Sequence, residues 1–193
     1  MSWWESLVQI RRNDLEKGSG VFISETEVLT AAHVVTQDGA PLPLAKLTMD
    51  IRYQSLLAVP VAVAVLPSWI TSGLTASDIA LVRVEARSGL GLPTVFGVPA
   101  PSASAMLESV GFEAQNDTEQ RLSGSVQCRV GPAGERLLYS KDFAPIGGMS
   151  GGPVYVGLAS GIHVAGILIR ESGSGLIGLS VTASVLAQLR SQL

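Results

Sequence analysis

The chain has few of the residues that cross-link proteins or bind metals. Among its 193 residues there are one cysteine, Cys128, and two histidines, His33 and His163. A single cysteine excludes a disulfide within the chain, and the alternating pattern around Cys128 indicates a packed strand residue. No group of His, Cys, Asp and Glu has the spacing of a zinc site. We therefore expect no metal and no other cofactor.

Charge is also sparse and balanced. The 13 basic and 16 acidic residues give a formal net charge of −3, and the longest basic run is Arg11-Arg12. Without a basic stripe, binding to nucleic acid is not indicated. The longest apolar stretch, residues 56–70, is too short to span a membrane and contains Pro60 and Pro67, which argues against a membrane protein.

The N-terminal sequence Met-Ser-Trp-Trp-Glu-Ser-Leu lacks the basic segment and apolar run of a secretory signal. Secreted proteins of this size often carry several disulfides, and this chain can form none within itself. Both features favour a reducing compartment, so we expect a cytoplasmic protein. A secreted protein that has already lost its signal is the alternative.

Apolar residues and turn formers are abundant instead. Hydrophobic residues make up 47% of the chain, and there are 21 glycines and 10 prolines, a composition that suits many short strands joined by turns. Turn formers gather between 88 and 104, so we expect one half at 1–95 and the other at 96–193. The last segment predicts a helix, because Thr182 can cap it and Val185, Leu186 and Leu189 recur at helical spacing.

Three short motifs carry candidate chemistry, in the order histidine, aspartate, serine. His33 ends a Thr-Ala-Ala-His run, Asp78 opens Asp-Ile-Ala-Leu, and Ser150 lies in Gly-Met-Ser-Gly-Gly-Pro at 148–153. A serine hydroxyl needs a nearby base to become a nucleophile, and an imidazole held by a carboxylate is such a base. Glycines around Ser150 allow a tight turn that could aim the backbone N–H groups of Gly148 and Ser150 at a developing oxyanion.

These motifs resemble those of the trypsin-like, chymotrypsin-fold serine peptidases of bacterial type. The likeness runs from about residue 7 to the final helix, with the motifs in the family's order. It implies an all-β, chymotrypsin-like fold of two antiparallel β-barrels of the six-stranded type with a C-terminal helix. It also implies a serine endopeptidase that acts on proteins or peptides, with His33 and Asp78 from the first barrel and Ser150 from the second.

One departure from the family concerns activation. Many animal members have an aspartate immediately before the serine, which pairs with a new N-terminus after zymogen cleavage. This chain has Met149 there, and a thioether cannot form that ion pair. We therefore expect no activation by this route.

The second histidine suggests a substrate pocket. His163 lies in a Gly-x-His-x-x-Gly strand that resembles the strand lining the substrate pocket of glutamate-specific and 3C-like proteases. By that resemblance, His163 would receive a Glu or Gln side chain before the scissile bond, while the backbone from Val164 to Gly166 would pair with the substrate. Pro145 stands where those relatives often place a hydroxyl residue, and a structural histidine is the alternative.

Two other functions compete with an active protease. A catalytically silent trypsin-like fold could serve as a protein-binding or regulatory module. Alternatively, the protease could be latent until a regulatory partner or a fused domain orders its oxyanion loop. Intact catalytic residues argue against the silent module.

Overall fold

The first half of the chain folds into a curled antiparallel sheet. The computed structural model describes residues 3–13, 16–72, 77–95, 105–131, 134–142, 145–158, 161–169 and 176–193. The sheet has the order β7-β6-β1-β2-β3-β9-β8, and its strands are β1 (Leu7–Arg12), β2 (Glu16–Ser24), β3 (Glu27–Thr30), β6 (Leu47–Ile51), β7 (Leu56–Ala58), β8 (Pro60–Val65) and β9 (Ala80–Val84). Its two edges, β7 and β8, follow one another in the chain, so the sheet curls into a half-barrel.

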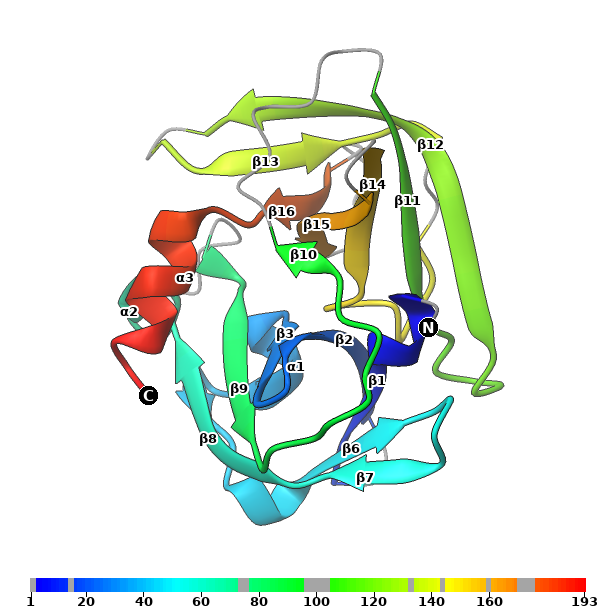
Figure 1. The fold of residues 1–193 in the computed structure, drawn as a ribbon. Helices are drawn as coiled ribbons and strands as arrows, with labels where there is room; N and C mark the ends of the chain where they lie inside the picture. The colour runs from blue at the N-terminus through cyan, green and yellow to red at the C-terminus, as the bar shows by residue number, and fades with distance from the viewer. Residues whose placement is uncertain are drawn as a thin grey trace.

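The second half is a closed six-stranded barrel. Its order is β15-β14-β11-β12-β13-β16, and pairing between β15 and β16 closes the ring. These strands are β11 (Ala105–Phe112), β12 (Glu119–Val130), β13 (Arg136–Tyr139), β14 (Pro153–Leu158), β15 (Gly161–Leu168) and β16 (Leu176–Ser180). In Figure 1 this barrel occupies the upper half of the molecule and the curled sheet the lower half.

Short elements complete the fold. They are the 3-10 turns η1 (Trp3–Ser6) and η2 (Leu44–Lys46), the helices α1 (Ala32–Val35), α2 (Pro67–Ser72) and α3 (Ala183–Arg190), the strand pair β4 (Thr36–Gln37) and β5 (Ala40–Pro41), and β10 (Thr94–Val95). Strand β10 precedes the expected boundary at 95/96, yet it pairs in parallel with β15 of the second half. The boundary itself stays a prediction.

The expected all-β, chymotrypsin-like architecture is confirmed, with a difference in the first half, which is a curled half-barrel. Alternation explains the strands: β6 reads buried, half-buried, buried, half-buried, buried, the period-2 pattern of a sheet with one face in a core. Within the described residues, no helix is long and apolar enough to cross a membrane.

The apolar core consists of two clusters, one of which spans both halves. One fills the curled sheet and continues into the second half through Val110, Phe112, Tyr155 and Ile167. The other lies inside the closed barrel and consists of Leu107, Val126, Leu138, Met149, Val154, Ala165, Leu168 and Ile177. Because the first cluster is shared, the two halves bury apolar surface against each other, which fixes their relative position.

The C-terminal helix returns to the first half. Thr182 caps α3 as expected, its side chain accepting a hydrogen bond from the Val185 N–H at 3.2 Å. The buried Leu186 and Leu189 belong to the shared cluster, and α3 packs on β8 and β9 beside α2 (Figure 1). At its last turn Arg190 donates two hydrogen bonds to Glu27 of β3, at 2.9 and 2.7 Å.

Replacing Glu27 with glutamine is expected to destabilise the fold by about 1 kcal/mol at neutral pH, because the Glu27 carboxylate is 11% exposed but the Arg190 side chain is 50% exposed. The hydrogen-bonded guanidinium of Arg190 holds the pKa of Glu27 below its usual value, which is about 4.3. The ion pair therefore contributes fully above about pH 4.3, and its contribution is lost as the pH falls through the lowered pKa. Denaturant unfolding at pH 7 and at acidic pH measures both effects.

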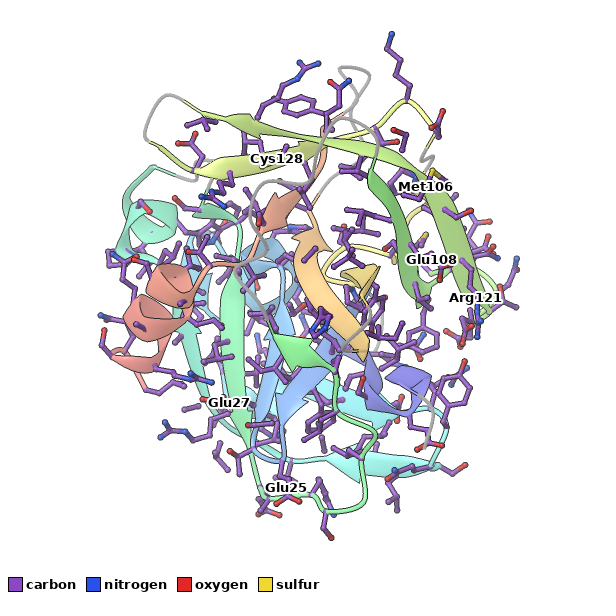
Figure 2. All side chains as sticks on the ribbon, turned by 45° about the horizontal axis from the view of Figure 1, so that its top comes forward. Glu25, Glu27, Met106, Glu108, Arg121 and Cys128 are labelled. Atoms are coloured by element: carbon purple, nitrogen blue, oxygen red, sulfur yellow. The ribbon has the colours of Figure 1, made fainter. Side chains whose placement is uncertain are left out.

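Glu25 provides the matched control for this variant. It is an exposed glutamate on the neighbouring turn, and Figure 2 shows it at the bottom of the molecule, apart from Glu27. We expect Glu25→Gln to leave the stability almost unchanged at both pH values. An equal loss in the two variants would contradict a specific role for the Glu27–Arg190 pair.

Candidate active site

The sheet register brings His33 and Asp78 together. Strands β3 and β9 are neighbours, with Thr30 opposite Ala80. His33 lies three residues beyond the end of this pairing on one strand and Asp78 two residues before it on the other. The single turn of α1 carries His33 and brings its ring within hydrogen-bond distance of the Asp78 carboxylate.

Asp78 uses both of its oxygens on His33. Oδ2 lies 2.7 Å from His33 Nδ1, and Oδ1 accepts a hydrogen bond from the His33 backbone N–H at 2.9 Å. The Asp78 residue is 4% exposed, whereas the His33 side chain is 38% exposed. Since an ionised carboxylate only accepts, Nδ1 carries the proton in this network, which leaves Nε2 as the acceptor on the open side of the ring.

Contacts on the far side of α1 hold its C-terminal end. Arg12 donates to the Thr36 carbonyl at 2.7 Å, and Thr36 Oγ1 donates to the Ala32 carbonyl at 2.8 Å. The Trp69 indole N–H donates in turn to Thr36 Oγ1 at 3.1 Å. These bonds fix the backbone of the turn that carries His33.

The loop that carries Ser150 packs against the first half, close to the segment that leads to His33. The Ser19 N–H of β2 donates to the Ser150 carbonyl at 2.7 Å. A side chain at Gly151, where φ is +82°, would overlap the Ser19 carbonyl and Thr30 Oγ1 and come within 2.8 Å of the Ala31 nitrogen. This close approach requires glycine, and it places Ser150 beside the segment that leads into α1.

Each backbone carbonyl of the loop 147–150 accepts a hydrogen bond. Those of Gly147 and Met149 accept from backbone N–H groups at 2.8 and 2.9 Å, and that of Ser150 accepts from Ser19. The carbonyl of Gly148 accepts from Ser19 Oγ at 2.9 Å. A trans peptide points its N–H away from its carbonyl, so tying the carbonyls also sets the directions of the N–H groups.

Three N–H groups of the loop 147–150, those of Gly147, Gly148 and Ser150, have no acceptor among the described residues. The Met149 N–H donates to Ile146 at 3.1 Å and the Gly151 N–H to Leu168 at 2.7 Å. The N–H groups of Gly148 and Ser150 are the two donors expected for an oxyanion, and the carbonyl ties aim them in fixed directions. In the described structure, no hydrogen bond joins Ser150 Oγ to the His33 ring. Hydrogen bonds between a catalytic serine and its base are often long before substrate binds.

Gly148 itself cannot be replaced without strain. Its φ is +98°, a left-handed value that favours glycine. A side chain there would overlap the Phe112 carbonyl and the Ala114 nitrogen. The glycine before Met149 is therefore required by the backbone of the loop.

Ser19 is a site residue whose role no sequence motif showed. It is fully buried and uses all its polar groups: its N–H and Oγ–H bind the carbonyls of Ser150 and Gly148, its Oγ accepts from the Phe112 N–H at 2.9 Å, and its carbonyl accepts from Thr30 Oγ1 at 2.7 Å. It thus joins β2, a central strand of the first sheet, to the loop 147–150 of the second half.

Replacing Ser19 with alanine is expected to cost about 1–3 kcal/mol of stability, because it leaves a buried carbonyl and a buried N–H without their partner. It should also lower kcat by about 10- to 100-fold, since the peptide between Gly148 and Met149 loses its hydrogen bond from Ser19 Oγ. Thermal unfolding and turnover measure the two effects. Ser180→Ala is the control: its buried Oγ donates to the Ala165 carbonyl at 3.1 Å, away from the loop, so stability should fall and kcat should not. Equal kcat in both variants would contradict the role of Ser19.

Met149 lies in the core of the closed barrel. Its side chain is fully buried and packs among the apolar residues of that barrel. The contact with Gly111 leaves no room for a side chain at that glycine. An apolar core therefore surrounds the position that in many animal relatives forms the ion pair. The absence of activation by that ion pair stays a prediction.

His163 is buried at a distance from the catalytic loop. It is 2% exposed and lies opposite Val156 of β14. Val156 packs against the core of the closed barrel, so His163 shares the face that turns into the barrel. The loop meets β15 at Leu168, which accepts from Gly151 and donates to Gly152. Five residues of strand separate the two positions, about 16 Å.

The register weighs against the expected pairing of the substrate with the backbone from Val164 to Gly166, which stays a prediction. Val164 pairs with Tyr155 on one side and Val95 on the other. Gly166 pairs with Val154 and with Ser180. Both edges of β15 are thus occupied at these residues, and no free edge is left for a substrate strand.

Pro145 is half-buried, five residues before Ser150, and its part in substrate binding stays a prediction. Among the described residues there is no group of three or more His, Cys, Asp and Glu side chains that could hold a metal ion.

A closed six-stranded barrel, a curled half-barrel and a C-terminal helix define a protein of the chymotrypsin-like fold class. The sequence profile of the trypsin-like peptidase domain matches residues 18–160. This range is well over half of the chain, and it includes His33, Asp78 and Ser150. The chain belongs to the family of trypsin-like peptidase domains.

Solved structures give the same fold. A Glu endopeptidase in complex with MPD superposes with a TM-score of 0.78 at 16% identity, over 97% of this chain and 90% of its own. The thermostable serine protease AL20 from an extremophilic microorganism has a TM-score of 0.70 at 14% identity, over 96% of this chain and 94% of its own. A search of curated proteins gives no significant match.

Proposed function

We propose that this protein is a serine endopeptidase with Ser150 as nucleophile, His33 as general base, and Asp78 orienting the imidazole. The observation that carries the proposal is the His33–Asp78 contact together with a loop whose carbonyls are all hydrogen-bonded, while the Gly148 and Ser150 N–H groups have no acceptor among the described residues. Membership of a peptidase family supports it and implies that the substrates are proteins.

The geometry supports the following steps. Ser150 Oγ attacks the scissile carbonyl carbon and gives its proton to His33 Nε2, while Asp78 stabilises the imidazolium. The carbonyl oxygen becomes an oxyanion held by the N–H groups of Gly148 and Ser150. Collapse breaks the C–N bond, the leaving amine takes the proton from His33, and an acyl-enzyme remains. Water, activated by His33, then hydrolyses the ester and restores Ser150.

A fluorophosphonate probe tests this proposal without a known substrate. Ser150 Oγ would displace fluoride from phosphorus and leave a stable adduct. We expect labelling of the native protein, with the mass added to the peptide that contains Ser150, and no labelling after heat denaturation. Labelling at another residue, or none at all, would overturn the proposal; the second result would favour a silent binding module.

A preference for Glu or Gln before the scissile bond is a separate proposal that rests on His163. The buried position of His163, about 16 Å along β15 from the catalytic loop, weighs against a direct contact with substrate. Cleavage of a peptide library by the wild type and by His163→Ala decides between the two cases. A Glu or Gln preference that disappears in the variant would establish the pocket role. Any preference that the variant keeps would place the pocket elsewhere.

Regulation and location are further proposals. A regulatory partner or fused domain would be needed if the isolated chain reacted slowly with the probe and a partner restored the rate. The hydrogen-bonded carbonyls of the loop 147–150 favour a site that forms without a partner or fused domain. The proposed cytoplasmic location rests on the single cysteine, and cell fractionation tests it.

A further inference from the structure

A second set of contacts joins the first half of the chain to the loop 147–150, which we call the oxyanion loop. These contacts involve the turn between β11 and β12, residues 113–118, which we call the 113–118 turn. Its Ala114 N–H donates to the Gly147 carbonyl at 2.8 Å. That carbonyl belongs to the same peptide as the Gly148 N–H, so the bond sets the direction of one oxyanion donor.

The 113–118 turn is a closed unit. The Glu113 N–H donates to the Thr118 carbonyl at 2.8 Å, and the Asp117 N–H donates to the Glu113 carbonyl at 3.1 Å. Asp117 has a φ of +54°, a left-handed value that Asp, Asn and Gly adopt more readily than other residues. A displacement of Asp117 would therefore move the turn, and Ala114 with it.

Two residues of the curled sheet hold Asp117 in place. The side-chain amide of Gln9 in β1 donates to Asp117 Oδ1 at 2.9 Å, and Gln9 is fully buried. Arg52, in the turn after β6, donates to the Asp117 carbonyl at 3.0 Å. The Arg52 guanidinium also lies 5.8 Å from the centre of the Phe112 ring. The 113–118 turn is thus tied at one end to the first half and at the other to the oxyanion loop.

We propose that Asp117 is a positioning residue: its link to Gln9 holds the 113–118 turn so that Ala114 keeps the Gly148 N–H aimed at the oxyanion. The proposal rests on the function proposed above. It explains how the nucleophile loop of one half stays in register with the His33–Asp78 pair of the other. Asp117 touches neither the substrate nor the reacting atoms and acts through Ala114 and Gly147.

Three substitutions at Asp117 separate the side-chain link from the backbone. Alanine removes the acceptor for Gln9 and disfavours the left-handed backbone, whereas glycine removes the acceptor but permits that backbone. Asparagine keeps an acceptor oxygen and also tolerates the left-handed region. We expect D117A and D117G to slow labelling of Ser150 by a fluorophosphonate about tenfold, a part of the 10²–10³ lost when an oxyanion donor is removed. D117N should restore most of the rate.

The readout distinguishes positioning from loss of fold. A structural defect would lower the melting temperature and the fraction of molecules that label, whereas poor aim of the Gly148 N–H lowers the rate constant of the molecules that do label. The midpoint of the pH profile of labelling should not move, because His33 and Asp78 keep their contacts. Arg121→Ala is the matched control: Arg121 pairs with Glu119 on the adjoining β12 and lies on the outer edge of the barrel in Figure 2. Its labelling rate should equal that of the wild type.

A double-mutant cycle tests the partner. Gln9→Leu should slow labelling as much as D117G, and the double variant of these two should be no slower than either, since each removes the hydrogen bond between Gln9 and Asp117. The proposal is overturned if D117A labels at the wild-type rate, if D117N is as slow as D117A, or if the two single effects multiply. Failure of the wild type to label would instead overturn the proposed function, so the two failures are distinct.

Discussion

Replacing Ser150 with alanine is expected to lower the rate of peptide hydrolysis by about six orders of magnitude. The change removes the only atom that can form the acyl-enzyme. His33, Asp78 and the two N–H donors remain, so a small residual rate over water should persist through the oxyanion contacts and substrate binding. The backbone bonds of Ser150 do not involve its side chain, so the fold should be unchanged.

Turnover and thermal unfolding of Ser150→Ala measure both parts of this prediction. Ser123→Ala is a suitable control, because Ser123 is an exposed serine on β12 that faces no catalytic residue in the sheet register. It should retain wild-type turnover. Substantial hydrolysis by the Ser150 variant, after contaminating proteases have been excluded with a second purification, would mean that another group is the nucleophile.

The candidate catalytic residues could be named from the sequence because each lies in a local motif. His33 and Asp78 flank strands that pair, and Ser150 lies in a glycine turn, so a few neighbouring residues encode each position. The fold class followed from the same resemblance together with the alternation of apolar residues. Even the cap of the last helix, Thr182, depends on one residue and its neighbour three positions on.

What holds the site together could not be predicted in this way. Ser19 meets Gly148 across 129 residues, and Gln9 meets Asp117 across 108. Most of the groups they join are backbone carbonyls and N–H groups, which every residue carries. No pattern in the sequence marks which of them will meet. These contacts depend on how the two halves pack, which is a property of the whole chain.

His163 shows a different limit. The Gly-x-His-x-x-Gly pattern is local, but its place in the site depends on the register of the β14–β15 hairpin. That register pairs Pro153 with Ile167 and His163 with Val156, so the loop meets β15 at Leu168. Motif spacing along a strand does not determine which residue reaches a neighbouring loop, because a shift in pairing moves every residue along the sheet.

Replacing Asp78 with asparagine is expected to lower kcat by about four orders of magnitude while the protein stays folded. The structure gives the reason in terms of acceptors. Asp78 accepts two hydrogen bonds from His33, one from the backbone N–H and one from Nδ1. Asparagine has one acceptor oxygen and one NH₂ group, so it cannot accept both.

The oxygen of the asparagine is expected to keep the hydrogen bond from the His33 backbone N–H, because a backbone N–H can only donate. The NH₂ group would then face Nδ1 and donate to it, which forces the ring proton onto Nε2. An Nε2 that carries a proton cannot take one from Ser150. Labelling by a fluorophosphonate should therefore slow along with turnover, although Ser150 and both N–H donors are intact.

Asp38 provides the control for this variant. It is exposed, lies five residues after His33, and has a φ of +51°, which asparagine tolerates. Asp38→Asn should leave turnover and labelling unchanged, and both variants should melt near the wild-type temperature. If Asp78→Asn kept more than about a tenth of the wild-type kcat, the His33 tautomer would not depend on Asp78, and the contacts of α1 with Arg12 and Thr36 would have to orient the ring on their own.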